Sequence, residues 1–402
     1  MIDVLIVGAG PAGLSAAINC AEHGLKVKVV DEFVKPGGRL LGQLHEEPNG
    51  EWWNGINEAN NLYQRAIGLG VDVECGVSVY NLEHIKPMWR VYTTNEIIEV
   101  SKLVLATGAA ESSVPVPGWT LPGVMSIGAA QVMTNVQRVK VGQRGVVIGV
   151  NVLSVAITRE LQIAGIDVAG MLLPEMNLLN RDAGDPNKVF ESLLRVSHLA
   201  PSKLIRIGSK LMKNEALRKL GVKFYPKGGF KMWGMPIHLR SSVVEILGES
   251  QVEAVRTVNI TSDGLPIPGT EQVVPVDFVC IAGGLYPLVE LASVAGCPFR
   301  FVPELGGHVP LHNMRMETPL EGLYVAGNIT GIESAKVAMA QGNVAGLSIV
   351  QNMKEHNKLV QEKLQKAIQN VDSTRSQALI QFDPHIIQGR INLEKQWQEQ
   401  TI

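Results

Sequence analysis

The sequence predicts an α/β protein with two Rossmann-like domains, the second inserted in the first. The chain opens with a strand, a glycine-rich turn, a helix and a second strand, and the same plan returns near residue 145. Apolar segments beyond residue 275 then lead back to the first domain. We expect the first domain at residues 1–115 and 275–350, the second at 116–274, and a helical tail at 351–402.

The opening strand is predicted at Asp3–Val7, an apolar run long enough for a buried parallel strand. A helix follows from Pro11 to about His23. The partial positive charge at the N-terminus of this helix favours an anion. The second strand covers Val27–Val30 and ends at Asp31. This order of elements is that of a βαβ unit.

Three glycines fit the pattern GxGxxG between the first strand and the helix. Gly8 allows a tight turn, Gly10 lets the backbone approach a pyrophosphate, and Gly13 lets the helix pack on the strand. Asp31 lies 23 residues after Gly8, where a carboxylate can accept both hydroxyls of an adenosine ribose. The complete context predicts a bound dinucleotide, whereas a glycine turn in an ordinary α/β unit is the alternative.

The rest of the first domain is predicted as one helix and several short strands. A buried strand, KLVLATGAAES, runs to Thr107 and Gly108, and a Pro- and Gly-rich crossing follows it. The other elements are expected at Ile56–Leu69 (helix), and at Val71–Cys75, Ser78–Leu82, Trp89–Thr94 and Ile97–Val100 (strands).

The second βαβ unit lacks two of the three glycines. Its strand is predicted at Gly145–Gly149 and its helix at Leu153–Ala164, and Gly149, Asn151 and Ser154 stand where the three glycines would be. Side chains at the last two positions would crowd a pyrophosphate. We therefore expect this domain to bind a mononucleotide or nothing, in preference to a nicotinamide dinucleotide.

Residues 177–232 depart from the pattern of a nucleotide-binding domain. Helices are predicted at Asn187–Val196 and Leu204–Leu220, and nine Lys or Arg but one acid, Glu215, lie between Lys203 and Lys231. A solvated helical face is one interpretation, and a patch that meets a phosphate or an acidic partner subunit is the other.

Composition excludes several classes of function. A net charge of −2 argues against a nucleic-acid binder. The four cysteines form no CxxC pair, so the sequence predicts no metal site and no redox dithiol, but buried thiols in a reducing cytosol. We read no signal peptide and no transmembrane segment. We expect a cytoplasmic protein, or one held at a membrane through partners.

Three further segments complete a flavin site. Gly37 and Gly38 allow a close backbone passage, and Arg39 can reach a phosphate oxygen. The segment TPLEGLYVAGN is predicted as an apolar strand that delivers Gly327 and Asn328 to the middle of the cofactor. A long helix is expected from Glu333 to about Met353, with amides that stabilise an anionic reduced flavin.

Together these residues resemble the two-dinucleotide-binding-domain flavoproteins, the glutathione and thioredoxin reductase-like superfamily, from Met1 to about Gly346. That resemblance implies FAD. The superfamily usually has Asp at the position of Asn328, and Asn keeps an acceptor oxygen. The redox dithiol of the disulfide reductases is absent.

Three longer stretches are similar to the FAD-containing α-type subunits of heteromeric amine and amino-acid dehydrogenases: LVLATGAAESSVPVPGWTLPGVMSIGAAQ, DFVCIAGGLYPLVELASVAGCPFRFVPELGGHVPL and GLYVAGNITGIESAKVAMAQGNVAG. That group includes dye-linked proline or hydroxyproline dehydrogenase, opine oxidase, sarcosine oxidase α-like chains and hydrogen cyanide synthase.

The resemblance implies an oxidoreductase subunit that relays electrons from CH-NH or CH-NH2 donors, with an amine-oxidising flavoprotein partner. It leaves open an FMN at a subunit interface, a nucleotide in the second domain, and an iron–sulfur cluster on another chain.

The sequence shows no catalytic acid–base pair. His308 is the best candidate for an imidazole that faces the flavin or a partner, and a structural loop histidine is the alternative. Other functions remain open: a stand-alone NAD(P)H:acceptor reductase, or a nucleotide-binding scaffold. The residues expected at the cofactor are Gly8, Gly10, Pro11, Ala12, Gly13, Asp31, Glu32, Gly38, Arg39, Thr107, Gly108, Gly327, Asn328 and Glu333.

Overall fold

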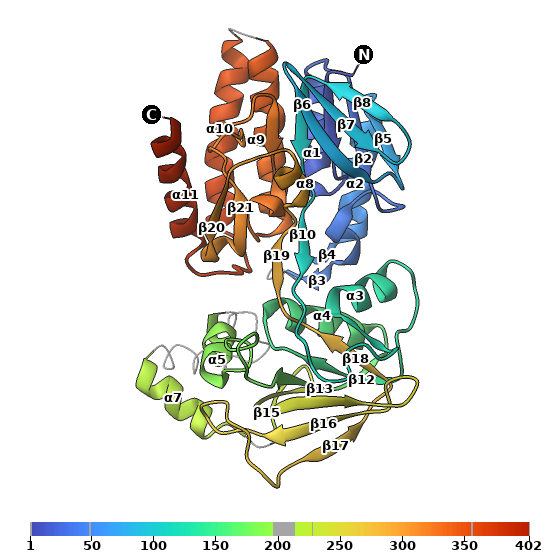
Figure 1. The fold of residues 1–402 in the computed structure, drawn as a ribbon, viewed down its shortest axis with the longest axis vertical. Helices are drawn as coiled ribbons and strands as arrows, with labels where there is room; N and C mark the ends of the chain where they lie inside the picture. The colour runs from blue at the N-terminus through green and yellow to red at the C-terminus, as the bar shows by residue number, and fades with distance from the viewer. Residues whose placement is uncertain (1, 48–49, 196–213, 227, 355–356, 402) are drawn as a thin grey trace. The chain divides into compact units, whose positions relative to one another are not determined.

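The computed structural model describes residues 2–47, 50–195, 214–226, 228–354 and 357–401. The chain divides into two compact units (Figure 1). Unit 1 comprises residues 1–43, 54–110 and 285–402, and unit 2 comprises residues 44–53 and 111–284. The predicted tail therefore belongs to unit 1. The chain returns to unit 1 after Gly284 rather than at residue 275, because a strand at Phe278–Ile281 pairs within the sheet of unit 2.

Unit 1 is built on a parallel sheet of five strands in the order β22-β9-β1-β2-β5. This unit also contains a three-stranded antiparallel sheet, β6-β7-β8, and the two-stranded sheet β20-β21. The bounds are β1 Val4–Val7, α1 Pro11–Glu22, β2 Val27–Asp31, η1 Gly38–Gly42, α2 Gly55–Gly68, β5 Asp72–Cys75, β6 Val79–Ile85, β7 Met88–Thr93, β8 Ile97–Val100, β9 Lys102–Leu105, β10 Ala109–Glu111, β19 Leu285–Pro287, α8 Glu290–Val294, β20 Phe299–Val302, η3 Pro303–Leu305, β21 Gly307–Pro310, β22 Leu323–Val325, η4 Gly327–Thr330, α9 Ala335–Met353, α10 Lys358–Ser376 and α11 Ile386–Thr401.

The central strands of unit 1 are apolar on both faces because both faces are covered. In β1, Val4 and Ile6 face a core shared with α1, α9 and α10, whereas Leu5 and Val7 face a core shared with β6–β8. Strand β9 alternates in the same way. This double burial explains why the two strands appear in the sequence as continuous apolar runs.

Unit 2 is a larger sheet with the order β11-β18-β12-β13-β15-β16-β17, and β14 pairs with β15. The strands β11, β18, β12 and β13 are parallel, as in the first unit. The bounds are β3 Leu44–Glu46, β4 Trp52–Asn54, β11 Val124–Ser126, α3 Ile127–Asn135, β12 Arg144–Ile148, α4 Val152–Ile163, β13 Asp167–Pro174, α5 Pro186–Arg195, α7 Glu215–Lys223, β14 Phe230–Met232, β15 Met235–Leu247, β16 Ala254–Asn259, β17 Gln272–Pro275 and β18 Phe278–Ile281.

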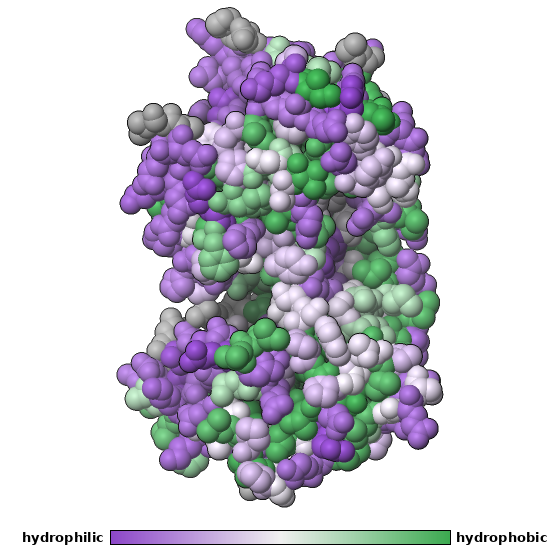
Figure 2. All heavy atoms as spheres, viewed as in Figure 1, coloured by the Kyte–Doolittle hydropathy of each residue, from purple (hydrophilic) through white to green (hydrophobic). Residues whose placement is uncertain are grey.

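The C-terminal tail, residues 357–401, forms the two helices α10 and α11. The apolar side of α10 places Val360, Leu364 and Val371 in the core shared with α9, and α9 and α10 lie side by side (Figure 1). Figure 2 shows hydrophilic side chains over the outward faces of both tail helices. The tail therefore covers apolar surface of unit 1 with an amphipathic helix.

Part of the predicted basic segment can be located. Residues 196–213 and 227 lie outside the described residues, and they include the first ten positions of the helix expected from Leu204. The described part forms α7, in which Lys219 pairs with Glu215 at 2.8 Å on an exposed face. Among the described residues, no helix is long and apolar enough to span a membrane.

Candidate functional site

The turn between β1 and α1 is shaped by glycines with distinct steric roles. Gly8 has a φ of +108°, and a Cβ there would lie 2.4 Å from the carbonyl oxygen of Ala106. A Cβ on Gly13 would lie 1.9 Å from the carbonyl oxygen of Gly8. Both positions therefore exclude any side chain, because the helix and two strand ends meet there.

Gly10 differs from these two glycines because the space beside it is open. It is the N-cap of α1, and no side chain caps the helix there. A Cβ on Gly10 would meet no protein atom within 4 Å. Gly38, with a φ of +53°, passes close by: its Cβ would lie 3.1 Å from the Cα of Gly10. An uncapped helix N-terminus beside open space fits a pyrophosphate.

Asp31 links the end of β2 to the glycine turn. Its Oδ2 accepts a hydrogen bond from the Ala9 amide at 2.6 Å, and its Oδ1 accepts one from the Phe33 amide at 2.8 Å. Partial burial raises the pKa of Asp31, and the two amide hydrogen bonds oppose that rise. Glu32 is exposed next to it. The half-buried Asp31 carboxylate fits the expected ribose-binding position.

The segment that follows β9 contains Thr107 and Gly108, and Arg39 contacts it from η1. Thr107 Oγ1 donates to the Leu288 carbonyl at 2.6 Å, and the Leu288 amide donates to Gly108 at 3.0 Å. Arg39 donates through Nη2 and Nε to the carbonyl of Ala109, at 2.9 and 3.2 Å. The guanidinium that we expected at a phosphate thus binds a main-chain carbonyl of the same unit.

The turn after β22 approaches α1 closely. Gly327 has a φ of +80°, and a Cβ there would lie 2.8 Å from the Cβ of Ala12. The Gly327 amide donates to Gln341 Oε1 at 2.9 Å. Asn328 Oδ1 accepts from the Glu333 amide at 3.2 Å. The two predicted segments of the site, around Ala12 and around Gly327, therefore do meet in unit 1.

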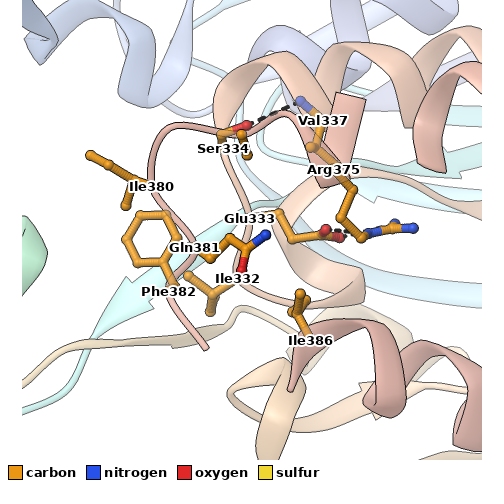
Figure 3. Close-up of a pocket in the computed structure, with 10 residues that line it drawn as sticks. Ile332, Glu333, Ser334, Val337, Arg375, Ile380, Gln381, Phe382 and Ile386 are labelled. Carbon is orange, nitrogen blue, oxygen red and sulfur yellow. Dashed lines mark hydrogen bonds and ion pairs between the residues drawn. The ribbon is translucent and has the colours of Figure 1, made fainter. Parts of the chain in front are cut away.

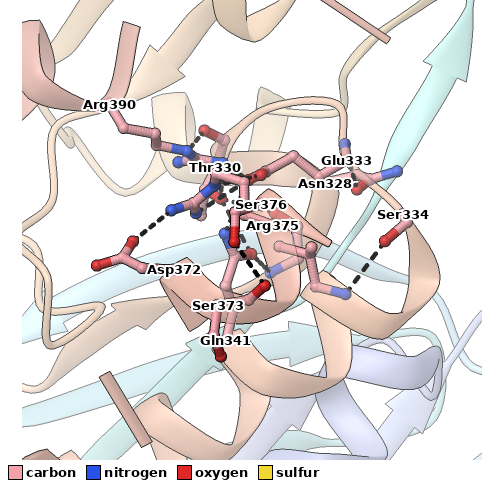
Figure 4. A network of polar contacts seen from close by, with 12 residues as sticks. Asn328, Thr330, Glu333, Ser334, Gln341, Asp372, Ser373, Arg375, Ser376 and Arg390 are labelled. Carbon is pink, nitrogen blue, oxygen red and sulfur yellow. Dashed lines mark hydrogen bonds and ion pairs between the residues drawn. The ribbon is translucent and has the colours of Figure 1, made fainter. Parts of the chain in front are cut away.

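The helix that the sequence predicts from Glu333 begins two residues later, so the predicted start is wrong and Glu333 lies before the helix. Helix α9 begins at Ala335, and Ser334 is its N-cap, because the Ser334 Oγ accepts from the Val337 amide at 3.4 Å. Glu333 precedes the helix and is buried. Arg375 Nε lies 2.5 Å from its Oε1, and Arg390 pairs with its Oε2 (Figure 4). The sequence interpretation missed both arginines.

A small pocket of about 10 Å³, which is room for about one water molecule, lies beside the start of α9 (Figure 3). Apolar side chains from the start of α9 and from the segment after α10 form most of its wall, including Ile332, Val337 and Phe382. Glu333 and Arg375 form the polar side. The tail therefore contributes to the surroundings of the α9 N-terminus, where the flavin ring is expected.

The second glycine motif is closed by its own side chains. Gly149 keeps the tight turn, with a φ of +104°. Asn151 caps α4 by accepting from the Ser154 amide, and Ser154 Oγ accepts from the Asn151 amide, both at 2.9 Å. Asn151 Nδ2 also donates to the Ala282 carbonyl at 3.0 Å. The helix N-terminus that would face a pyrophosphate is thus capped from within unit 2.

Glu160 on α4 is a buried carboxylate that sequence reasoning missed. Its Oε2 accepts from Gln131 and Asn135 at 2.8 and 2.7 Å, and its Oε1 accepts from the Leu44 amide at 3.2 Å. Burial raises its pKa to about 7, against the effect of these hydrogen bonds. The only sequence signal was an acid in a helix that is apolar at most positions.

The other residues singled out in the sequence are His308 and the four cysteines. His308 is exposed on the β20–β21 hairpin, with its ring 5.0 Å from that of Phe301. Cys20, Cys280 and Cys297 are buried free thiols and Cys75 is half-buried. Within the described ranges, no three His, Cys, Asp or Glu side chains are grouped in a way that could hold a metal ion.

Comparison with known proteins places this geometry in a family. Residues 2–342 match the family described as Pyridine nucleotide-disulphide oxidoreductase. One of the opine oxidase chains of Agrobacterium tumefaciens (strain Ach5) is 27% identical over 88% of this chain and 66% of its own length. The HcnB chain of hydrogen cyanide synthase from Pseudomonas protegens is 25% identical over 87% of this chain and 70% of its own. The present chain thus spans slightly less than two thirds of the opine oxidase relative.

Solved structures agree on the fold. L-proline dehydrogenase from P. horikoshii superposes with a TM-score of 0.63 at 19% identity, over 91% of this chain and 58% of that one. Thioredoxin reductase of Lactococcus lactis gives 0.61 at 19% identity, over 90% of this chain and all of that one. The predicted fold class, with two Rossmann-like domains, is therefore confirmed.

Proposed function

This chain belongs to the pyridine nucleotide-disulphide oxidoreductase family, and we propose that it is a FAD-dependent subunit of a heteromeric amine or amino-acid dehydrogenase. In this proposal it relays electrons from the oxidation of an amino acid or a secondary amine, of the proline, hydroxyproline, opine or glycine kind. Relatives named as subunits of opine oxidase, hydrogen cyanide synthase and sarcosine oxidase support the donor class and a second, amine-oxidising chain.

One observation carries the proposal: the two glycine motifs differ in whether the helix N-terminus is free. In unit 1 no side chain caps α1, and Gly10 borders open space. In unit 2, Asn151 and Ser154 cap α4. The first site can therefore bind the pyrophosphate of FAD at the free helix N-terminus, whereas the capped second site disfavours binding of a nicotinamide dinucleotide. A stand-alone NAD(P)H:acceptor reductase would need both sites.

The residues of unit 1 would hold FAD along its whole length. The amides after Gly10 would bind the pyrophosphate, and Asp31 would orient the adenosine ribose. Asn328 and Gly327 would lie along the ribityl chain, with Gly38 near the phosphates, while the Arg39 guanidinium holds the Ala109 carbonyl. The N-terminus of α9 would favour negative charge on the reduced ring. When bound, FAD supplies the two-electron acceptor that no side chain can provide.

The proposal is tested on the native protein with any co-purifying chain. Mass spectrometry of released small molecules should identify FAD, and it also shows whether FMN or another nucleotide is present. Anaerobic addition of L-proline, sarcosine or an opine should bleach the flavin once the partner is present. Fast bleaching by NADH alone in stopped flow would instead support the stand-alone reductase. Bound nucleotide with no reduction by any donor would indicate a scaffold.

A further inference from the structure

Two helices of the C-terminal tail each bring one arginine to the same buried carboxylate. Arg375 lies at the end of α10, and its Nε and Nη2 donate to the two oxygens of Glu333 at 2.5 and 3.3 Å. Arg390 comes from α11 and pairs with the same group through Nη2. Glu333 is only 7% exposed. Two guanidinium groups from separate helices can bind one buried carboxylate only if both helices are packed in place.

Burial and neighbouring charges determine the protonation state of each group in this cluster. Burial alone would raise the pKa of Glu333, but Arg390 and Arg375 outweigh it and lower that pKa. Arg375 also pairs with Asp372 at 2.7 Å, which is largely exposed. His312 is buried beside Arg390, and burial with the nearby guanidinium lowers its pKa to about 3, so this imidazole is neutral. The buried part of the cluster therefore holds one negative and two positive charges.

Hydrogen bonds join this cluster to the turn at Gly327. Arg390 donates to the carbonyl oxygen of Thr330 at 2.8 Å and to its hydroxyl oxygen at 3.2 Å. The Thr330 hydroxyl in turn donates to the carbonyl of Gly327 at 2.8 Å. Gln341 donates to Glu333 at 3.3 Å and accepts from the Gly327 amide (Figure 4).

The same cluster reaches Asn328 through the main chain of Glu333, whose amide donates to Asn328 Oδ1. The carbonyl of Gly327 and the side-chain oxygen of Asn328 are thus held by Thr330 and Glu333, which the tail arginines bind. The Gly327 amide is held by Gln341, which is connected to the arginines through Glu333. A buried network whose members are mutually bonded is rigid, and losing one member disturbs the rest.

We propose that Arg375 and Arg390 are positioning residues that fix the Gly327–Asn328 turn for FAD, so that packing of the tail and binding of the flavin are coupled. This inference rests on the proposed function, since it assumes that FAD occupies unit 1. Such coupling is reciprocal. If the packed tail increases the affinity for FAD by some factor, bound FAD must favour the packed tail by the same factor.

The first experiment compares single variants of the full chain. Arg390→Gln and Arg375→Gln should weaken FAD binding by about tenfold or more, measured by flavin fluorescence on flavin-free protein. They should also change the visible circular dichroism of the bound flavin and make its midpoint potential more negative, because a positive charge is lost near the start of α9. Arg390→Lys should recover only part of the affinity, since an ammonium cannot bridge Thr330 and Glu333 with the same geometry.

The matched control is Arg300→Gln. Arg300 also binds the tail, through Gln400 Oε1 at 2.8 Å, but it lies outside the Glu333 cluster. It should change FAD affinity by less than about twofold. Arg390→Gln leaves the buried Glu333 carboxylate with one partner fewer. If this variant fails to fold for that reason, the double variant Glu333→Gln with Arg390→Gln, which also removes the carboxylate charge, is measured in place of the single variant.

The second experiment measures hydrogen exchange of the tail with and without FAD. Amides of α11 should exchange about tenfold more slowly when FAD binds, in proportion to the affinity lost in Arg390→Gln. Amides of the β6–β8 sheet serve as the reference for general stabilisation. Equal affinities and flavin spectra for wild type, Arg390→Gln and Arg300→Gln would overturn the inference and leave the proposed function intact. Wild-type protein with no affinity for FAD would overturn the proposed function itself.

Discussion

Asn151 and Ser154 cap one another at the N-terminus of α4: each side-chain oxygen accepts a hydrogen bond from the other residue's amide, at 2.9 Å in both directions. The corresponding positions of the first unit are Gly10 and Gly13, and no side chain caps α1. The same βαβ plan therefore leaves one helix N-terminus available to a ligand and closes the other.

Removing this cap should cost stability without affecting the flavin. Asn151→Ala should lower the free energy of unfolding of unit 2 by about 1 kcal/mol, because the cap of α4 is lost. FAD content should stay at the wild-type level. Urea unfolding and the flavin absorbance of the purified variant measure the two quantities. The double variant Asn151→Gly with Ser154→Gly restores glycine at both positions of the motif. Fast reduction of the flavin by NADH in this variant would show that the two side chains prevent NADH from binding to unit 2.

Gly10→Ala and Gly13→Ala should separate ligand binding from folding. A methyl on Gly10 meets no protein atom within 4 Å, so the flavin-free thermal midpoint should stay unchanged while FAD affinity falls by about tenfold or more. A methyl on Gly13 collides with the Gly8 carbonyl, so Gly13→Ala should lower the free energy of unfolding by about 1–3 kcal/mol even without flavin. Equal loss of stability in both variants would contradict the assignment of Gly10 to ligand contact.

Glu160 should make the stability of unit 2 depend on pH. Burial raises its pKa from 4.5 to about 7, so between these values the folded state keeps a proton that the unfolded state releases. The free energy of unfolding should therefore fall as pH rises from about 4.5 to about 7, by on the order of 3 kcal/mol. Glu160→Gln should flatten this dependence, measured by thermal unfolding at pH 5 to 8.5. The exposed Glu249→Gln is the control and should keep the wild-type profile.

Close packing of α1 against α9 should depend on Gly342. A Cβ there would lie 2.1 Å from the Ala12 carbonyl, so Gly342→Ala should destabilise unit 1 by about 1–3 kcal/mol and weaken FAD binding through Ala12. Gly68 at the end of α2 has no atom within 4 Å of such a Cβ. Gly68→Ala should instead be neutral, or stabilising by up to about 1 kcal/mol. Urea unfolding of the two variants makes this comparison directly.

Much of the βαβ geometry could be predicted because it depends on neighbours in the chain. The helix expected from Pro11 to His23 is α1 at Pro11–Glu22, and the strand expected at Val27–Val30 is β2 at Val27–Asp31. The start of α9 was expected at Glu333, two residues too early, because Ser334 supplies the N-cap. An acid near a helix start suggests a first-turn residue, and only the observed backbone shows which residue is the N-cap.

The sequence by itself determined where the chain turns from strand to helix in both units, because the positive φ of Gly8 and Gly149 is a backbone conformation that favours glycine. Only the tertiary structure decided what surrounds Glu333 and Glu160. Arg375 and Arg390 follow Glu333 by 42 and 57 residues, and Leu44 precedes Glu160 by 116. No local pattern encodes such partners, since their meeting depends on how whole helices pack.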